Sequence, residues 1–174
     1  MNKRVVFTSF NSMIVALAIM ALTCIFLALP EQFASIQGIK CSGYEVLFNY
    51  KNIGGINYLN DNVGGRVSAV IFIILVLMVA SAASLIFHKK DPTLTLIGGV
   101  LNAINGFLFL MMRIWLAVIY PSKAVSMNWV SYVSGALLLI IGGWLIYLGI
   151  REIINAKTEA IQKKAQSYNY LKNK

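Results

Sequence analysis

Residues 93–120 read TLTLIGGVLNAINGFLFLMMRIWLAVIY, and this stretch decides the architecture of the chain. It is long enough to cross a bilayer, and Arg113 is the only charge inside any apolar run of the sequence. Gly98, Asn102, Asn105 and Arg113 recur at helical spacing and so share one face of a helix. Because hydrocarbon offers polar groups no hydrogen-bond partner, we expect this face to turn inward toward protein or water. The stretch therefore predicts the central helix of a membrane bundle.

The composition of the 174 residues also indicates a membrane protein. Apolar residues make up 59% of the chain and charged residues 12%, whereas soluble domains are about half apolar and about a quarter charged. The net charge of +9 comes from basic residues that flank the apolar runs, which is the charge pattern of a membrane protein. No stretch resembles a helix-turn-helix, a zinc finger or an aromatic–basic RNA surface, so nucleic acid is not an expected partner.

The sequence predicts an all-α membrane protein, a four-helix transmembrane bundle with a long, partly ordered first outer loop. The first apolar run exceeds the 7–15 residues of a signal-peptide core, so we expect it to be retained as a span. The transmembrane domain covers residues 1–150 and a basic tail covers residues 151–174. The expected spans are residues 7–29, 67–87, 94–120 and 129–150, with the outer loop at residues 30–66.

Small residues and a helix cap predict how the spans pack. Close helix approach in lipid relies on glycine, alanine and serine at spacings of about four or seven residues. Asp91 followed by Pro92 is typical of the start of a helix, so the second and third spans should be antiparallel neighbours. The residues expected at helix contacts are Ala80, Ser84, Gly98, Gly106, Gly135 and Gly142.

Arg113 has two readings. As a structural anchor, it reaches up to a backbone carbonyl or to one of the outer-loop carboxylates, Glu31, Glu45 and Asp61. Alternatively, it attracts anions in a water-filled vestibule with Asn102 and Asn105 below it. We expect the anchor, because intramembrane charges generally find a partner.

The basic residues predict the orientation. One side of the expected bundle carries ten of them and the other side carries Lys40, Lys51, Arg66 and Lys123. By the positive-inside rule both termini are cytoplasmic. The tail continues the fourth span as a helix, and its basic residues could meet anionic lipid at the inner leaflet.

One stretch carries a resemblance. Pro30 and the run Ser42-Gly43-Tyr44-Glu45-Val46-Leu47-Phe48 resemble uncharacterised small four-span membrane proteins of Gram-positive bacteria. There the first span ends near a proline, and a comparable stretch opens a long outer loop. The layout is also loosely similar to that of claudin-type tetraspans. The resemblance implies the plasma membrane of a bacterial cell and brings no activity, cofactor or catalytic residue.

The sequence contains no signature of an enzyme. No Asp or Glu falls inside an expected span, and there is no phosphate-binding glycine loop, no H-E-x-x-H and no nucleophile elbow. We therefore expect neither cofactor nor metal. The leading hypothesis is a non-enzymatic membrane interaction protein, an accessory or scaffold subunit that binds another membrane protein or itself. The alternative is a small oligomeric channel or transporter for a small solute.

Overall fold

Four long helices form the body of the computed structural model, which describes residues 9–29, 33–35, 40–48, 64–89, 91–119 and 125–172. They are α1 (Ser9–Ala28), α3 (Gly64–Ile86), α4 (Thr93–Ile119) and α5 (Trp129–Lys172). All four are long and apolar enough to cross a membrane, as expected of a multi-pass membrane protein. The expected bundle of four helices is thus confirmed, and α1, α3 and α4 begin and end within a few residues of the expected spans.

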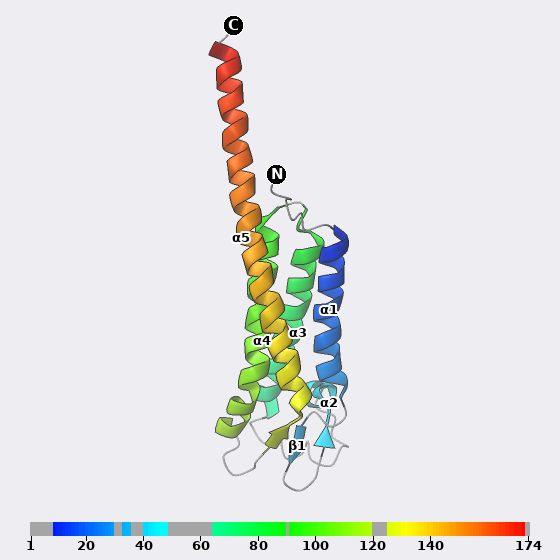
Figure 1. Ribbon diagram of the computed structural model, residues 1–174. Helices are drawn as coiled ribbons and strands as arrows, with labels where there is room; N and C mark the ends of the chain where they lie inside the picture. Colours follow the sequence, from blue (N-terminus) through cyan, green and yellow to red (C-terminus); the bar gives the residue numbers. More distant parts are fainter. Residues whose placement is uncertain are drawn as a thin grey trace.

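The helices alternate in direction. The turn that joins α3 to α4 lies at the same end of the bundle as the start of α1, and α5 extends well beyond that end (Figure 1). Asp91 begins α4 as expected: its Oδ1 accepts the Thr93 N–H at 2.8 Å, and its carbonyl accepts the Leu94 N–H at 3.1 Å. We call this the turn end of the bundle.

A small sheet covers the opposite end, which we call the sheet end. Strands β1 (Phe33–Ser35), β2 (Lys40–Cys41) and β3 (Val125–Met127) pair antiparallel in the order β2-β1-β3. In the β1–β3 pair Phe33 faces Met127 and Ser35 faces Val125, so the segment after α1 is tied to the segment between α4 and α5. The sequence predicted a partly ordered first outer loop, but it predicted nothing at the position of β3.

A short helix, α2 (Gly43–Phe48), follows β2 and caps the end of α1. The Ser42 hydroxyl accepts the Glu45 N–H at 3.2 Å, and the Glu45 carboxylate accepts the Ser42 N–H at 2.6 Å. This reciprocal pair is a capping box, which satisfies backbone donors that the first turn of a helix leaves free. Gly43 lies against Leu27 of α1, where an added Cβ would come within 3.0 Å of the Leu27 Cα.

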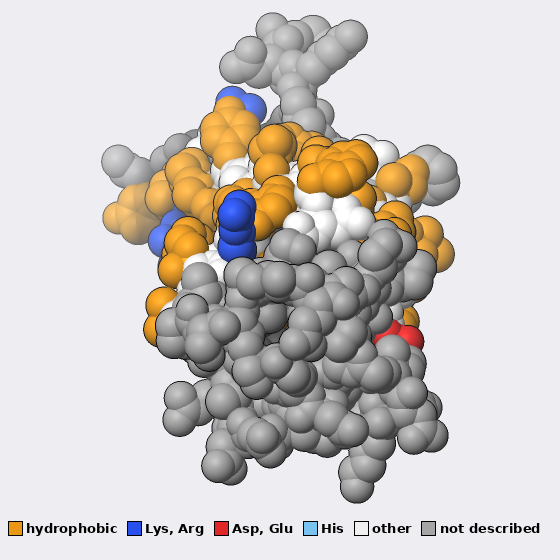
Figure 2. Space-filling model, turned by 90° about the horizontal axis from the view of Figure 1, so that it is seen from below, with side chains coloured by type: hydrophobic (Ala, Val, Ile, Leu, Met, Phe, Trp, Pro, Cys, Tyr) orange, Lys and Arg blue, Asp and Glu red, His pale blue; other side chains and the backbone are white. Residues whose placement is uncertain are grey.

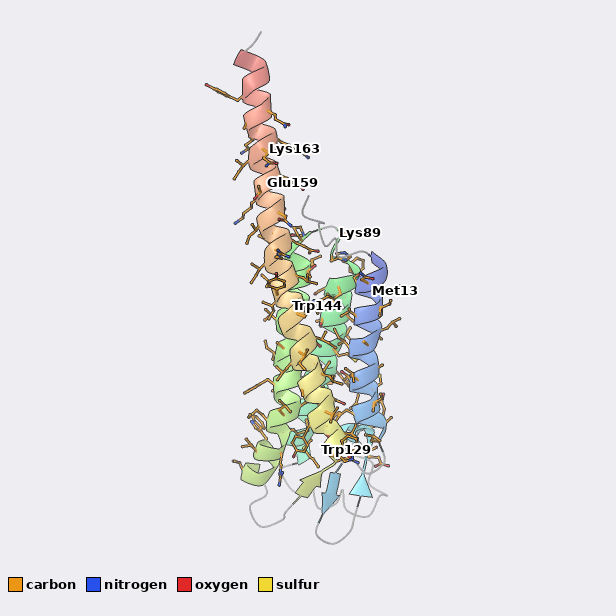
Figure 3. The ribbon with its side chains drawn as sticks, viewed as in Figure 1. Met13, Lys89, Trp129, Trp144, Glu159 and Lys163 are labelled. Atoms are coloured by element: carbon orange, nitrogen blue, oxygen red, sulfur yellow. The ribbon has the colours of Figure 1, made fainter. Side chains whose placement is uncertain are left out.

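The core runs along the bundle axis and is largely apolar. Phe26 of α1 and Phe109 of α4, both fully buried, meet edge to face with ring centroids 4.4 Å apart. The outer surface is also apolar: Phe72 and Val79 are each 59% exposed, and Figure 2 shows hydrophobic side chains over much of the described surface. A bundle that is apolar inside and outside is suited to lipid. Trp129 lies at the sheet end and Lys89 at the turn end, at opposite ends of this apolar body (Figure 3).

Candidate functional site

The expected polar face of α4 is only partly buried. Asn102 and Asn105 have no exposed surface, whereas the Arg113 side chain is exposed. The physical reason is visible in Figure 1, where α4 diverges from α5 toward the sheet end, so a residue on the same helical face emerges from the interface. Ile114 and Trp115 beside it are also exposed, at 54% and 49%. The three residues therefore do not line one common cavity.

Asn102 joins α4 to α5. Its Nδ2 donates to the Leu138 carbonyl oxygen across the helix interface at 2.7 Å. Because this carbonyl already accepts a bond within α5, the contact adds a second bond to it. The Oδ1 of Asn102 is buried and has no partner in the part of the chain that the structure describes.

Asn105 is the one side chain of the described core in which both polar atoms are orphaned. Its Nδ2 and Oδ1 are buried and lack a hydrogen-bond partner among the described residues. An unpaired buried amide costs about 1–3 kcal/mol, and an apolar surround raises that cost. A polar group held at such a cost calls for an explanation.

Of the three carboxylates expected as outer-loop partners of Arg113, the structure describes one. Glu31 and Asp61 lie outside the described residues. Glu45 is described, and its carboxylate serves the capping box of α2. The anchor therefore stays a prediction, with Glu45 already committed to another contact.

Glycines bring α4 and α5 closest together. A Cβ on Gly106 would lie 2.7 Å from the Gly135 carbonyl oxygen, one on Gly142 would lie 2.7 Å from the Ala103 nitrogen, and one on Gly149 would lie 2.5 Å from the Leu96 nitrogen. The α5 members of this set recur every seven residues, so the contact follows one stripe of the helix. We call these contacts the glycine seam. Three of the expected packing residues, Gly106, Gly135 and Gly142, lie in it.

The contact between α3 and α4 is made by a hydrogen bond as well as by small residues. The hydroxyl of Ser81, which is fully buried, donates to the Gly98 carbonyl oxygen at 2.9 Å. Ala80 and Ser84, the pair expected here, are half-buried, and the Ser84 hydroxyl donates to Ala80 within its own helix at 2.8 Å. Sequence spacing identified the correct turn of α3 but not Ser81 as the residue that crosses to α4.

At the turn end, a polar contact fixes the point where α5 leaves the bundle. The buried Thr95 hydroxyl donates to the Glu152 carboxylate at 2.9 Å. The Arg151 guanidinium lies over the ring of Tyr147 at 5.4 Å from its centroid, within the range of a cation–π contact. The sequence could have indicated the Thr95–Glu152 contact only through a hydroxyl and a carboxylate at the ends of two spans. Such pairs are too common in sequences to predict a hydrogen bond.

Beyond this contact α5 continues alone. The helix runs without interruption from Trp129 to Lys172, about 66 Å at 1.5 Å per residue, roughly twice the thickness of a bilayer core. Ile154, Ile161 and Tyr168 recur at seven-residue intervals there and are 56%, 67% and 72% exposed. We call residues 151–172 the α5 arm; Glu159 and Lys163 mark its middle in Figure 3. The expected helical tail is confirmed as a continuation of the last span.

The side chains that commonly ligate metals are spread over the part of the chain that the structure describes. No group of three or more His, Cys, Asp or Glu side chains gathers there. His88 at the turn end is buried, and its Nδ1 lies 2.8 Å from the Leu85 carbonyl oxygen. Cys24 is a free thiol on the exposed surface of α1.

No model of a known protein family matches this chain, and no curated protein is similar to it in sequence. The functional assignment therefore rests on the geometry of the chain itself.

Proposed function

We propose that the protein is a non-enzymatic integral membrane interaction protein, an accessory or scaffold subunit that binds its partner through the α5 arm. The observation that carries this proposal is the exposed apolar stripe of Ile154, Ile161 and Tyr168 on a helix that leaves the bundle. A single helix in water gains most of its stability from packing its apolar side, so a free arm of this kind is suited to a partner.

The charge of the arm favours an acidic partner helix. Residues 151–172 carry five basic and two acidic side chains. Lys157 and Lys164 are exposed and follow Ile154 and Ile161 by three residues, so each lies beside the stripe. Charges flanking an apolar stripe select the partner in helix pairs, and a second copy of this arm would bring like charges together. The partner that fits is an amphipathic helix flanked by Asp and Glu.

The direction of the arm favours a protein over the membrane surface. Because α5 is one continuous helix, its arm continues the line of the last span, away from the bundle (Figure 1). An amphipathic helix on a bilayer lies in the plane of the interface, which this arm could reach only by a break in α5. Anionic lipid is therefore the weaker of the two expected partners.

Photo-crosslinking in native membranes tests the proposal. A photoreactive residue at Ile161 lies on the stripe, and one at Lys163 lies on roughly the opposite side of the same turn. We expect Ile161 to crosslink to an acidic amphipathic segment of one protein, with loss of the product at high salt, and Lys163 to give none. Equal products from both positions, or products only with lipid or a second copy, would contradict the proposal.

The orientation belongs to the same proposal: a cell membrane, with both termini and the arm in the cytoplasm. Support comes from the basic residues, since the turn end carries Lys89 and the arm. In intact cells we expect a membrane-impermeant thiol reagent to label Cys41 and to spare a cysteine placed at Lys172. Labelling at Lys172 would reverse the orientation.

An oligomeric channel or transporter is the second candidate, favoured by the orphaned amide of Asn105 within the bundle. Against it, Asn102 and Asn105 are sealed from solvent, and the exposed Arg113 lies off their interface. Solute flux in liposomes separates this candidate from the first.

A further inference from the structure

We infer that Asn102 and Asn105 bind an internal water molecule in the middle of the bundle. This inference is independent of the interaction function proposed for the α5 arm. The starting observation is that three polar atoms, Asn102 Oδ1, Asn105 Nδ2 and Asn105 Oδ1, are buried without partners among the described residues. They come from neighbouring turns of α4 and face the same interior.

The spacing of the two amides suits a single bridging molecule. Residues three apart on a helix have Cβ atoms about 5–6 Å apart, and a water with two hydrogen bonds of about 2.8 Å spans such a gap. The bond from Asn102 Nδ2 to Leu138 fixes which way the Asn102 amide faces and leaves its Oδ1 as an acceptor. The water would accept from Asn105 Nδ2 and donate to Asn102 Oδ1.

A third polar group lies at the same height on α1. Helices α1 and α4 run in the same direction, and the Phe26–Phe109 contact sets their relative height. Thr23 precedes Phe26 by three residues and Asn105 precedes Phe109 by four, so their heights differ by about 1.5 Å. Thr23 is fully buried and its hydroxyl donates to Ile19 at 3.0 Å, which leaves its oxygen free to accept the second water proton.

The enclosure selects water over a larger ligand or a protein partner. Thr23, Asn102 and Asn105 have no exposed surface, so a second chain has no access to them. The Ser81–Gly98 bond sets the register of α3 against the antiparallel α4. Ile74 lies seven residues before Ser81 and Asn105 lies seven residues after Gly98, so Ile74 lies opposite Asn105. Ile74 is also fully buried. Buried waters in proteins typically make about three hydrogen bonds to polar groups that otherwise lack a partner. Asn102 Oδ1 and Asn105 Nδ2 are two such groups, and the Thr23 oxygen can accept a third hydrogen bond.

Water-edited solid-state NMR on the full chain in lipid bilayers tests the site. With ¹⁵N-labelled asparagine and isoleucine, we expect water magnetisation to reach the Asn105 side-chain amide about as fast as that of Asn155, which is exposed on the α5 arm. The backbone amide of Ile74 is the dry control, and we expect transfer there to be several-fold slower. Transfer to Asn105 at the rate of Ile74 would overturn the inference.

The bridge itself is tested by one substitution. In Asn105→Leu we expect the Asn102 side-chain amide to stay in place through its Leu138 bond, with its water-derived intensity reduced by half or more. An unchanged intensity at Asn102 would mean that no water joins the two amides. The measurement on the unsubstituted protein decides the presence of the water even where the leucine variant does not fold.

Discussion

Alanine substitution at Gly142 and at Gly143 separates the close packing of α4 against α5 from every other effect of removing a glycine. The two residues are adjacent in one helix. A Cβ at Gly142 would lie 2.7 Å from the Ala103 nitrogen and 2.9 Å from its Cα, whereas a Cβ at Gly143 would meet nothing within 4 Å. Gly143 is thus a matched control within the same turn.

The magnitude follows from these distances. The Gly142 Cβ is about 0.7 Å short of the 3.4 Å at which contacts become ordinary, and its obstacle is backbone, which cannot rotate away. Forced backbone shifts of this kind cost about 1–3 kcal/mol. Both variants share the gain of up to about 1 kcal/mol that alanine brings to a helix interior. The difference between them isolates the clash, and we expect Gly142→Ala to be less stable by about 1–3 kcal/mol.

Reversible unfolding of the purified protein in mild detergent, monitored by the helical circular dichroism signal, measures this difference in the free energy of unfolding. We expect Gly143→Ala to match or slightly exceed the unsubstituted protein. Equal stability of the two variants would refute the account, because it would mean that α4 and α5 are not in backbone contact at Ala103.

Three further predictions concern the two ends of the bundle. Thr95→Val should lower the free energy of unfolding by about 1.5–3 kcal/mol, since it removes a partly buried hydrogen bond to the Glu152 carboxylate, and Glu152→Gln should lower it less. Equal losses would mean that the charge of Glu152 is irrelevant. Arg113→Gln should leave solute flux in liposomes unchanged and shift stability by only about 0.5 kcal/mol, because the side chain is exposed; altered flux would support the channel instead. The Thr93 backbone N–H and side chain hold the pKa of Asp91 below its ordinary value. The stability that the Asp91 carboxylate contributes is therefore present above its unfolded-state pKa and is lost as pH falls through its folded-state pKa. In an Asp91→Ala variant the free energy of unfolding should lose this part of its dependence on acid pH, and an unchanged pH profile would contradict the account.

The sequence predicted those parts of the fold that depend on periodicity and composition. Apolar run lengths located four helices, Asp91 and Pro92 located the start of α4, and glycine spacing located Gly106, Gly135 and Gly142 at a helix contact. These features are local to one helix, or repeat along it, so they can be read without knowledge of its neighbours.

The parts that could not be predicted depend on the distance between elements. Arg113 shares a face with Asn102, but whether that face is covered depends on the divergence of α4 from α5. The pairing of β3 with β1 joins two segments about ninety residues apart, each too short to carry a strand signal of its own. Predicting the bond from Ser81 to Gly98 would have required the rotation of α3 about its own axis. The spacing of small residues leaves that rotation uncertain by one residue position.

The continuity of α5 gives the chain the mechanics of a lever. The glycine seam joins α5 to α4 inside the bilayer, so the two tilt together, and no break separates the seam from the arm. The arm extends about 33 Å beyond the bundle, and a tilt of about 10° in the membrane would sweep its far end through about 6 Å. Transmembrane helices change tilt when the bilayer thickens or thins. A change in membrane thickness would therefore displace the end of the arm, and a partner bound there, sideways. No rearrangement inside the bundle would be needed.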